Sequence, residues 1–481
     1  MRIRLYKTAF LLISTFLLLS CDDTDSFAPA GNRTLTFAEE TVDLGVVFSG
    51  MPSATKDIWV YNSTGDGIVC SEIRLAQGNQ TGFRVNVDGW YLGPTSGYRA
   101  QDVEIASGDS IRIFVELTSF ATGREEPQEL SDYLIFTLDG GTTQRLLLKA
   151  TTLDAVEWEN YDISSSVTVA EDRPVLVRKT ITVAEGAVLT IAAGTTLYFA
   201  NNAGIDVHGT LVCEGEAGNE VCLRGDRIDN MFDYLPYDRV AGQWQGVHFY
   251  PSSVGNRLTY TDIHSTYNGI VIDTPTNEGI HLTGEQLTVH NCQGYGILSQ
   301  GANIQLVNTQ VSNALESCLN LEGGGAYING CTFAQFYPFD SQRGAAIRFS
   351  NYEADLYQMT CLNSIFTGYA DDVVAGAVAD NGKAFVYQFD HCLLRTEIPS
   401  NEHKDNFVDC IVEDITSEEE GSFHNFAVFD TENLIYDFSL ATGSAAIGNA
   451  APVTVPSIDR LGASRDEHPD MGAYEYIEAN E

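Results

Sequence analysis

The side chains of this sequence best suited to acid–base chemistry lie in one short stretch. Asp371 and Asp372 form a carboxylate pair, and Lys383 follows in a turn-like segment. Paired carboxylates can hydrolyse a glycosidic bond, and a lysine can abstract an acidic proton from a sugar. Both sets are incomplete, because the stretch has no Gly-His-Gly and no Arg-x-Lys, and an isolated lysine in a turn is usually solvated. We therefore predict no catalytic residue, and whether these three side chains form a site stays open.

The sequence also predicts no metal site and no cofactor. No cysteine pair has the CxxC spacing of zinc sites, and residues 226–229 lack the ligand spacing of a calcium loop. His290 and His391 lie in strand-like segments, where a position at the edge of the core or on the strand surface is expected rather than a ligand role. Nucleophile–base triads and phosphate-binding motifs are absent from the sequence.

Aromatic residues concentrate in two segments that interrupt the strand pattern, residues 227–245 and 335–344. Exposed aromatic clusters commonly mark binding surfaces. The candidate binding surface consists of Phe232, Tyr234, Tyr237, Trp244, Phe336 and Tyr337. The alternative is that both segments fold back and cover either a hydrophobic core or the junction between two domains.

The elements that must position these residues are β-strands. Residues 34–152 contain short alternating strands, such as Asp57–Tyr61 and Ser110–Val115, separated by turns. This spacing favours an immunoglobulin-like β-sandwich. The Cys…Trp…Cys signature of true immunoglobulin domains is missing, so the prediction concerns the architecture alone.

Residues 153–438 instead repeat with a period near 22, which predicts an all-β solenoid of stacked coils. Ile263, Val289, Val311 and Phe333 occupy equivalent inward positions at spacings of 26, 22 and 22. Asn291 and Asn313 each follow such a position by two residues, and we expect their amides to pair along the solenoid axis.

Residues 439–481 are predicted to cap this array, because an open sheet edge would promote aggregation. Asp459-Arg460-Leu461-Gly462 and Pro469-Asp470-Met471-Gly472-Ala473-Tyr474 resemble the closing segment of bacterial right-handed parallel β-helix proteins. We interpret Asp459, Arg460, Arg465 and Asp470 as a structural cluster of opposite charges.

Nine cysteines remain besides Cys21, an odd number that excludes complete internal pairing. Most lie between apolar residues of strand-like segments, which favours buried thiols. Cys213 and Cys222 flank a glycine-rich turn and are the best candidates for a disulfide.

The N-terminus predicts export. Three basic residues precede the apolar run Ala9–Leu19, which is too short to span a membrane. The run ends in Leu18-Leu19-Ser20-Cys21, which resembles the lipobox of bacterial lipoproteins. The resemblance implies that residues 1–20 are a signal peptide and that Cys21 carries acyl chains (palmitate among them), which anchor the chain in a membrane.

Residues 21–33 are expected to form an acidic tether. Asp22-Asp23-Thr24-Asp25 is similar to the export signal of surface lipoproteins of the Bacteroidota. This resemblance implies attachment to the outer membrane with display at the cell surface.

The charge of the chain limits the classes of partner that it can bind. The formal net charge is −40, and removal of the three basic residues of the signal peptide leaves −43. Such an acidic surface repels nucleic acid, anionic lipid and polyuronates. We expect a protein partner at the outer membrane or a neutral glycan, and no nucleic acid.

The sequence as a whole is similar to β-helix lipoproteins of the Bacteroidota, which combine a sandwich with a pectate-lyase-like parallel β-helix. The motif Gly242-Gln243-Trp244-Gln245-Gly246 contributes to this resemblance. We expect a non-enzymatic surface scaffold or interaction module, accessory to a transport or assembly barrel. The alternative is a carbohydrate-binding or polysaccharide-degrading β-helix.

Overall fold

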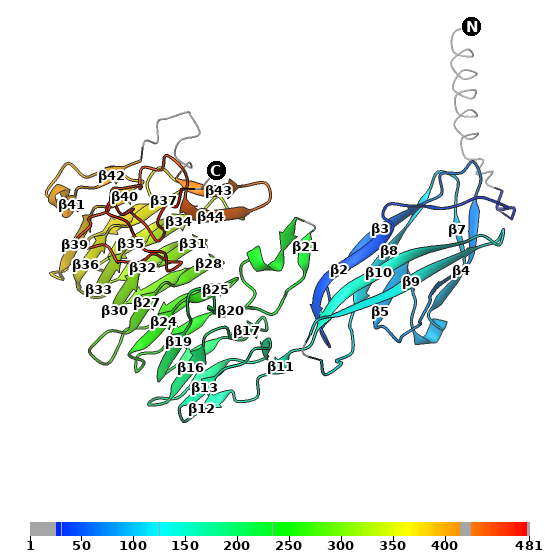
Figure 1. The fold of residues 1–481 in the computed structure, drawn as a ribbon, viewed down its shortest axis with the longest axis horizontal. Helices are drawn as coiled ribbons and strands as arrows, with labels where there is room; N and C mark the ends of the chain where they lie inside the picture. The colour runs from blue at the N-terminus through cyan, green and yellow to red at the C-terminus, as the bar shows by residue number, and fades with distance from the viewer. Residues whose placement is uncertain (1–25, 30, 125, 233, 414–424, 479–481) are drawn as a thin grey trace, which may run out of the picture. The chain divides into compact units, whose positions relative to one another are not determined.

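The structure is a computed structural model that describes residues 26–478 except 30, 125, 233 and 414–424. It consists of two compact units, Met1–Asp154 and Ala155–Glu481. Within the described residues every regular element is a β-strand or a short 3-10 helix (Figure 1). No helix among them is long and apolar enough to cross a membrane. The fold is therefore all-β, as the sequence predicted.

The N-terminal unit is a β-sandwich of two five-stranded sheets. The first sheet contains, in spatial order, β1 (Thr36–Phe37), β3 (Lys56–Tyr61), β8 (Ser110–Leu117), β5 (Phe83–Val87) and β6 (Trp90–Tyr91). The second contains β2 (Thr41–Phe48), β10 (Thr143–Leu153), β9 (Gln128–Leu138), β4 (Ile68–Leu75) and β7 (Arg99–Ile105). A 3-10 turn, η1 (Pro94–Ser96), follows β6.

Alternation of apolar and polar residues explains the sandwich. In β8 the buried residues Ile111, Ile113 and Val115 alternate with more exposed ones, which turns one face of the strand inward. Neighbouring strands are antiparallel except β2 and β10, which pair in parallel. These inward faces form one hydrophobic core within the unit.

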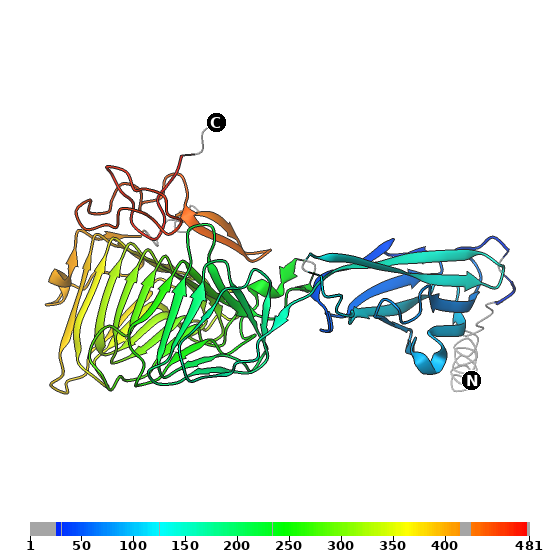
Figure 2. The ribbon, with the colours of Figure 1, turned by 60° about the horizontal axis from the view of Figure 1, so that its bottom comes forward.

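The C-terminal unit is a parallel β-helix, whose stacked coils are visible in Figure 2. Each complete coil adds one strand to each of three parallel sheets. We name them sheets A, B and C.

Sheet A carries the candidate site described below. Its strands are, in spatial order, β11 (Val156–Glu157), β14 (Val175–Val177), β17 (Thr196–Phe199), β20 (Val221–Gly225), β25 (Thr261–His264), β28 (Thr288–Cys292), β31 (Gln310–Ala314), β34 (Thr332–Gln335), β37 (Ile365–Gly368), β40 (Leu393–Leu394) and β42 (Ile411–Val412).

Sheets B and C complete each coil. Sheet B contains β12 (Asp162–Ile163), β15 (Ile181–Val183), β18 (Ile205–Val207), β23 (Val247–Phe249), β26 (Ile270–Ile272), β29 (Ile297–Gln300), β32 (Ser317–Glu322), β35 (Ala345–Ser350) and β38 (Val374–Ala377). Sheet C contains β13 (Val167–Val169), β16 (Val188–Ala192), β19 (Thr210–Glu214), β24 (Asn256–Thr259), β27 (Leu282–Glu285), β30 (Asn303–Val307), β33 (Gly324–Asn329), β36 (Leu356–Leu362), β39 (Phe385–Asp390) and β41 (Phe407–Val408).

The predicted inward positions coincide with the observed register. Ile263 pairs with Val289, Val289 with Val311, and Val311 with Phe333. All four side chains are fully buried in the shared core of the coils. Each coil thus supplies one wall of its neighbour's core, which is why a single coil could not fold alone.

The predicted pairing of asparagine amides is confirmed between two neighbouring coils. Asn291 and Asn313 both adopt a left-handed backbone, with φ of 55° and 53°. This conformation is tolerated by asparagine better than by most residues. The Nδ2 of Asn313 donates to the Oδ1 of Asn291 at 3.4 Å, so the amides stack along the axis.

The expected disulfide is not formed in this structure. Cys213 points into the core from β19, whereas Cys222 occupies the outer face of β20. Both are free thiols. The glycine-rich turn between them reverses the chain, but strand alternation sends the two side chains to opposite faces.

The last part of the chain lies along the side of the coils. The hairpin β43 (Phe426–Asp430) and β44 (Ile435–Leu440) is orange in Figure 2, and the closing segment that follows is red. Phe438 and Met471 belong to one cluster with Ile365 and Leu393, which lie on the outer face of sheet A. The closing segment therefore covers the outer face of the later coils.

The charged residues of this segment make structural contacts. Arg460 forms a two-pronged ion pair with Glu220, at 2.8 and 3.0 Å. Arg465 pairs with Glu475 and donates to the backbone of Asp470. The segment thereby reaches from the later coils back to Glu220, which directly precedes β20.

Candidate functional site

A cleft of about 540 Å³ opens on the outer face of sheet A, where the closing segment leaves earlier coils uncovered. This volume lies within the range of small-molecule binding sites. The floor is formed by β25, β28 and β31, and the hairpin β43–β44 and the closing segment provide walls. The insertion between β20 and β23 also lines the cleft. It contains the small hairpin β21 (Asn230–Phe232) and β22 (Leu235–Pro236) and then η2 (Tyr237–Arg239).

The parallel register explains why polar residues gather on this floor. Because inward residues occupy every second position, their neighbours form two outward rows across successive coils. One row is Thr196, Cys222, Asp262, Thr288 and Gln310. The other is Tyr198, Arg224, His264, His290 and Ser312. In the later coils the first row continues as Ile365 and Leu393, where the closing segment packs.

His264 lies at the centre of the charged part of the cleft. Its Nδ1–H donates to Asp262 at 2.5 Å and its Nε2–H donates to Asp238 at 3.0 Å. Asp238 is also held by Arg224 at 2.5 Å. His290 stacks on the His264 ring, with 4.8 Å between centroids, and approaches the second oxygen of Asp262 at 3.5 Å.

This arrangement determines the protonation states of His264, Asp238 and Asp262. Burial alone would disfavour ionisation of all three groups, but attraction between the imidazolium and the two carboxylates outweighs it. The pKa of His264 is raised to about 9 through the charge of Asp262 and the hydrogen bonds to both aspartates. The pKa of Asp238 is lowered to about 2, and that of Asp262 lies well below its usual range. At neutral pH the cleft therefore holds an imidazolium between two carboxylates.

The insertion that supplies Asp238 folds back onto the floor. Ser265 and Asn291 donate to the backbone carbonyl of Asp238. Arg239 donates to the backbone of Asn433 in the turn of the β43–β44 hairpin, at 3.0 Å. The insertion and the hairpin thus meet at one end of the cleft.

The other end of the cleft is neutral and polar. Gln310 accepts a hydrogen bond from the Tyr474 hydroxyl at 2.6 Å and donates to Ser312 at 2.9 Å. Asn313 is only 4% exposed, and its Oδ1 has no hydrogen-bond partner among the described residues. A buried polar atom without a partner is uncommon and calls for an explanation. Here the atom belongs to a residue that lines the cleft, where a ligand hydroxyl could donate to it.

Part of the predicted aromatic surface is core. Trp244 is 0% exposed, stacks on Phe199 at 4.2 Å, and donates from its ring nitrogen to the backbone of His264. Phe336 and Tyr337 are 0% and 6% exposed. The prediction of a binding surface is wrong for these three residues, because their segments fold back over the β-helix, the alternative that the sequence left open.

The remaining predicted aromatics differ from one another. Phe232 and Tyr234 are 56% and 51% exposed, with rings stacked 5.9 Å apart. Tyr237 is half-buried beneath the guanidinium of Arg227, at 4.0 Å. Among the six predicted residues, only Phe232 and Tyr234 form an exposed pair.

Asp371, Asp372 and Lys383 do not assemble into a common site. Lys383 donates to the backbone carbonyls of Tyr352 and Glu353 at 2.8 and 2.6 Å. Asp372 accepts from Thr396 at 2.7 Å. Among the residues the structure describes, no hydrogen bond or ion pair joins Lys383 to either aspartate.

One feature of the sequence, strand alternation, points to the cleft. Once Ile263 is placed inward, alternation sends Asp262 and His264 outward, and the coil spacing sets His290 beside His264. Arg224, on β20, stands in the same outward row as His264. Asp238 joins them only through the fold of the insertion. That part of the site had no local signal.

No protein-family model matches the sequence, and no curated protein matches it either. Solved structures show distant likenesses. Pectate lyase Pel9A is 11% identical with a TM-score of 0.29, and the match covers 68% of this chain and 88% of that one.

Two further likenesses each cover 27% of this chain. A PapD-like domain of human CEP192 is 9% identical, with a TM-score of 0.18 and 94% of that chain covered. A family 123 glycoside hydrolase from Clostridium perfringens is 11% identical, with a TM-score of 0.17 and 26% of that chain covered. At these scores the likenesses carry no argument about activity, and the fold rests on the strand pairing described above.

Proposed function

We propose that this chain is a lipid-anchored lipoprotein of a bacterial outer membrane, of the kind found in Bacteroidota, which binds a neutral glycan in the cleft of sheet A. The observation that carries the proposal is the Oδ1 of Asn313, a buried acceptor without a partner among the described residues, in the floor of a polar cleft. Sugars offer many hydroxyl donors, so a glycan is the ligand class that best supplies the missing partner.

The composition of the cleft supports the same ligand class. Gln310, Ser312 and Asn313 offer neutral donors and acceptors, and Tyr436 and Tyr474 add aromatic surface beside them. A few fixed polar groups combined with aromatic surface are typical of specific ligand sites. The guanidinium of Arg460 is already paired with Glu220, so it is not available for an acidic sugar.

The electrostatics favour a neutral ligand and binding rather than hydrolysis. The net charge of −40 repels polyanionic chains. Asp238 and Asp262 are both ionised and both tied to His264, whereas glycoside hydrolysis needs one carboxyl group that stays protonated as a general acid.

A glycan array probed with the full-length chain tests this proposal. We expect binding to neutral oligosaccharides and not to polyuronates. Asn313→Gly should weaken that binding by about fivefold, because one hydrogen bond is worth about 1 kcal/mol. Glycine keeps the left-handed backbone of this position accessible.

The matched control is Gln358→Ala, which removes an exposed amide from the outer face of sheet C in β36. It should bind as the unmodified chain does. An array without any bound glycan, or equal loss in the Asn313 and Gln358 variants, would contradict the assignment of the cleft.

A second candidate function, a scaffold that holds a protein partner at the outer membrane, is favoured by one observation. Phe232 and Tyr234 present two stacked, exposed rings, and exposed aromatic pairs often anchor interfaces. Replacement of both by alanine should abolish co-purification of a partner, such as an outer-membrane barrel, after detergent extraction. Unchanged co-purification would remove this candidate.

A further inference from the structure

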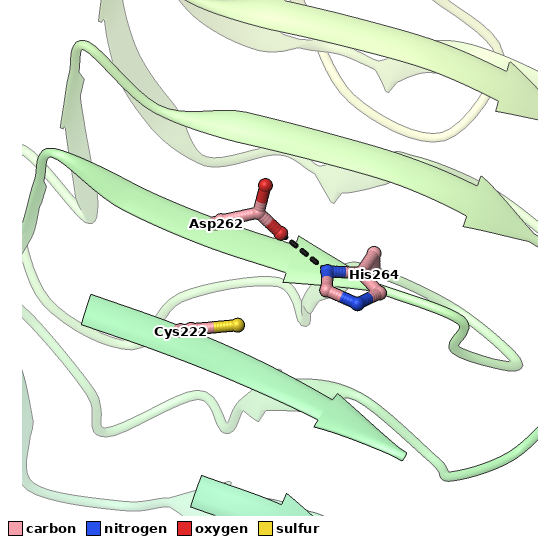
Figure 3. A group of neighbouring side chains, drawn as sticks. All are labelled: Cys222, Asp262 and His264. Atoms are coloured by element: carbon pink, nitrogen blue, oxygen red, sulfur yellow. Dashed lines mark hydrogen bonds and ion pairs between the residues drawn. The ribbon is translucent and has the colours of Figure 1, made fainter. Parts of the chain in front are cut away.

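Three side chains of different chemistry meet beside the charged end of the cleft, which Asp262 and His264 line. Cys222 lies on β20, and Asp262 and His264 lie on the neighbouring strand β25. Their sulfur, oxygen and nitrogen atoms all lie within 4.8 Å of one another. Figure 3 shows the three side chains directed toward a common point, with the hydrogen bond between Asp262 and His264.

We propose that Cys222, Asp262 and His264 form a binding site for a divalent transition-metal ion, with zinc as the best-fitting metal. The set offers one thiol, one carboxylate and one imidazole. Burial raises the pKa of the Cys222 thiol, so a metal ion would displace the thiol proton when it binds the sulfur. Mixed sulfur, nitrogen and oxygen ligands suit zinc, whereas calcium and magnesium require oxygen ligands.

The surroundings of His264 strengthen this assignment. A histidine that binds a metal through one ring nitrogen usually donates its other N–H to a carboxylate, which orients the ring. If Nδ1 faces the metal, Nε2–H already donates to Asp238 at 3.0 Å. Asp238 is in turn held by Arg224 at 2.5 Å. The supporting contacts of a metal ligand are therefore already present.

The parallel register brings the ligands together. Cys222 and Asp262 are partners in the sheet, so their side chains stand side by side on the outer face. Asp262 and His264 are two positions apart on one strand and share that face. In the absence of a metal, the proton between Asp262 and His264 satisfies both groups, and a metal ion would replace it.

The position of the site leaves an ion accessible. Asp262 and His264 line the cleft, and the side chain of Asp262 is 25% exposed. His290 lies against both residues and could complete the coordination after a change of rotamer, as could a water molecule. Zinc sites with three protein ligands commonly keep the fourth position open.

This inference goes beyond the proposed glycan binding and does not depend on it, because metal binding is measured without any glycan. The full-length chain is stripped with a chelator and titrated with zinc in a calorimeter. Cobalt serves as the spectroscopic probe, because a thiolate ligand gives cobalt a charge-transfer band in the near ultraviolet. We expect one zinc ion per chain and this band with cobalt.

Variants distinguish the proposed ligands from Asp238, which orients the His264 ring without binding the metal. Cys222→Ser should remove the band, and His264→Gln should weaken zinc binding more than Asp238→Asn does. Asp238→Asn keeps all three ligands, so the band should persist while zinc affinity falls about 10- to 100-fold. Because this variant retains the complete ligand set, it keeps the test decisive even if the Cys222 or His264 variant fails to fold.

Two controls come from elsewhere on the β-helix. Cys410→Ser removes a half-buried thiol that is not one of the three proposed ligands. His391→Gln removes a histidine that, like His264, pairs with an aspartate, here Asp390 at 2.6 Å, but does not belong to the proposed site. Both should bind zinc and cobalt as the unmodified chain does. The proposal is overturned if the stripped chain binds no zinc, if Cys222→Ser keeps the band, or if Cys410→Ser abolishes it.

Discussion

At the residue scale, the cleft is organised by one histidine held between two carboxylates. His264 donates to Asp262 and Asp238, and Arg224 neutralises part of the charge of Asp238. Burial would favour the neutral imidazole, yet the two anions keep it charged.

This arrangement predicts how the metal-free chain responds to pH. The pKa of His264 is about 9 when folded, above the usual 6.5. The protonated ring therefore contributes stability that is complete below pH 6.5 and is lost as the pH rises through about 9. NMR titration of the imidazole in the chelator-treated chain should give this raised pKa, and Asp238→Asn should lower it. A His264 titration near pH 6.5 would show that the two carboxylates do not hold the proton.

At the element scale, the sequence predicted the strands far better than the loops. The inward row from Ile263 to Phe333 and the amide pairing of Asn291 with Asn313 were predictable, because they follow from a repeat that every coil must obey. The buried positions of Trp244 and Phe336 were not predictable. An aromatic residue in a segment that interrupts the strand pattern can lie on the surface or cover the core. Strand alternation predicts Asp262 and His264, whereas Asp238 depends on the path of the insertion.

The buried position of Trp244 gives a direct test at this scale. Trp244→Ala should reduce the free energy of unfolding by about 3–5 kcal/mol, because it leaves a large cavity beside Phe199. Phe232→Ala, in the exposed part of the same insertion, should change it by less than about 0.5 kcal/mol. Denaturant unfolding followed by far-ultraviolet circular dichroism measures both. Equal effects would mean that Trp244 is not part of the core.

At the scale of the whole molecule, the chain joins a β-sandwich to a β-helix and carries a strong negative charge. Cys21, the predicted lipidation site, and the acidic tether from Asp22 to Asp25 lie outside the described residues. The repeat length and strand alternation were sufficient to predict both architectures. The ligand was not predictable from them, because a parallel β-helix presents the same backbone whatever its outer rows contain.

The proposed anchor predicts where the protein is found. Cys21→Ala should move the chain from the detergent phase to the aqueous phase on phase separation, because the acyl chains supply the membrane affinity. Protease treatment of intact cells then tests whether the unmodified chain is displayed at the surface. Retention of the Cys21→Ala chain in the detergent phase would contradict lipid anchoring through this residue.

The central claim is that the outer face of sheet A, where the closing segment leaves it open, is the functional face of the molecule. Hydrogen–deuterium exchange of the full-length chain, with and without the best-binding oligosaccharide, tests it most directly. The account predicts that the glycan slows exchange in β28, β31 and the β43–β44 hairpin. Slowed exchange confined to the sandwich or to the outer face of sheet C would contradict it.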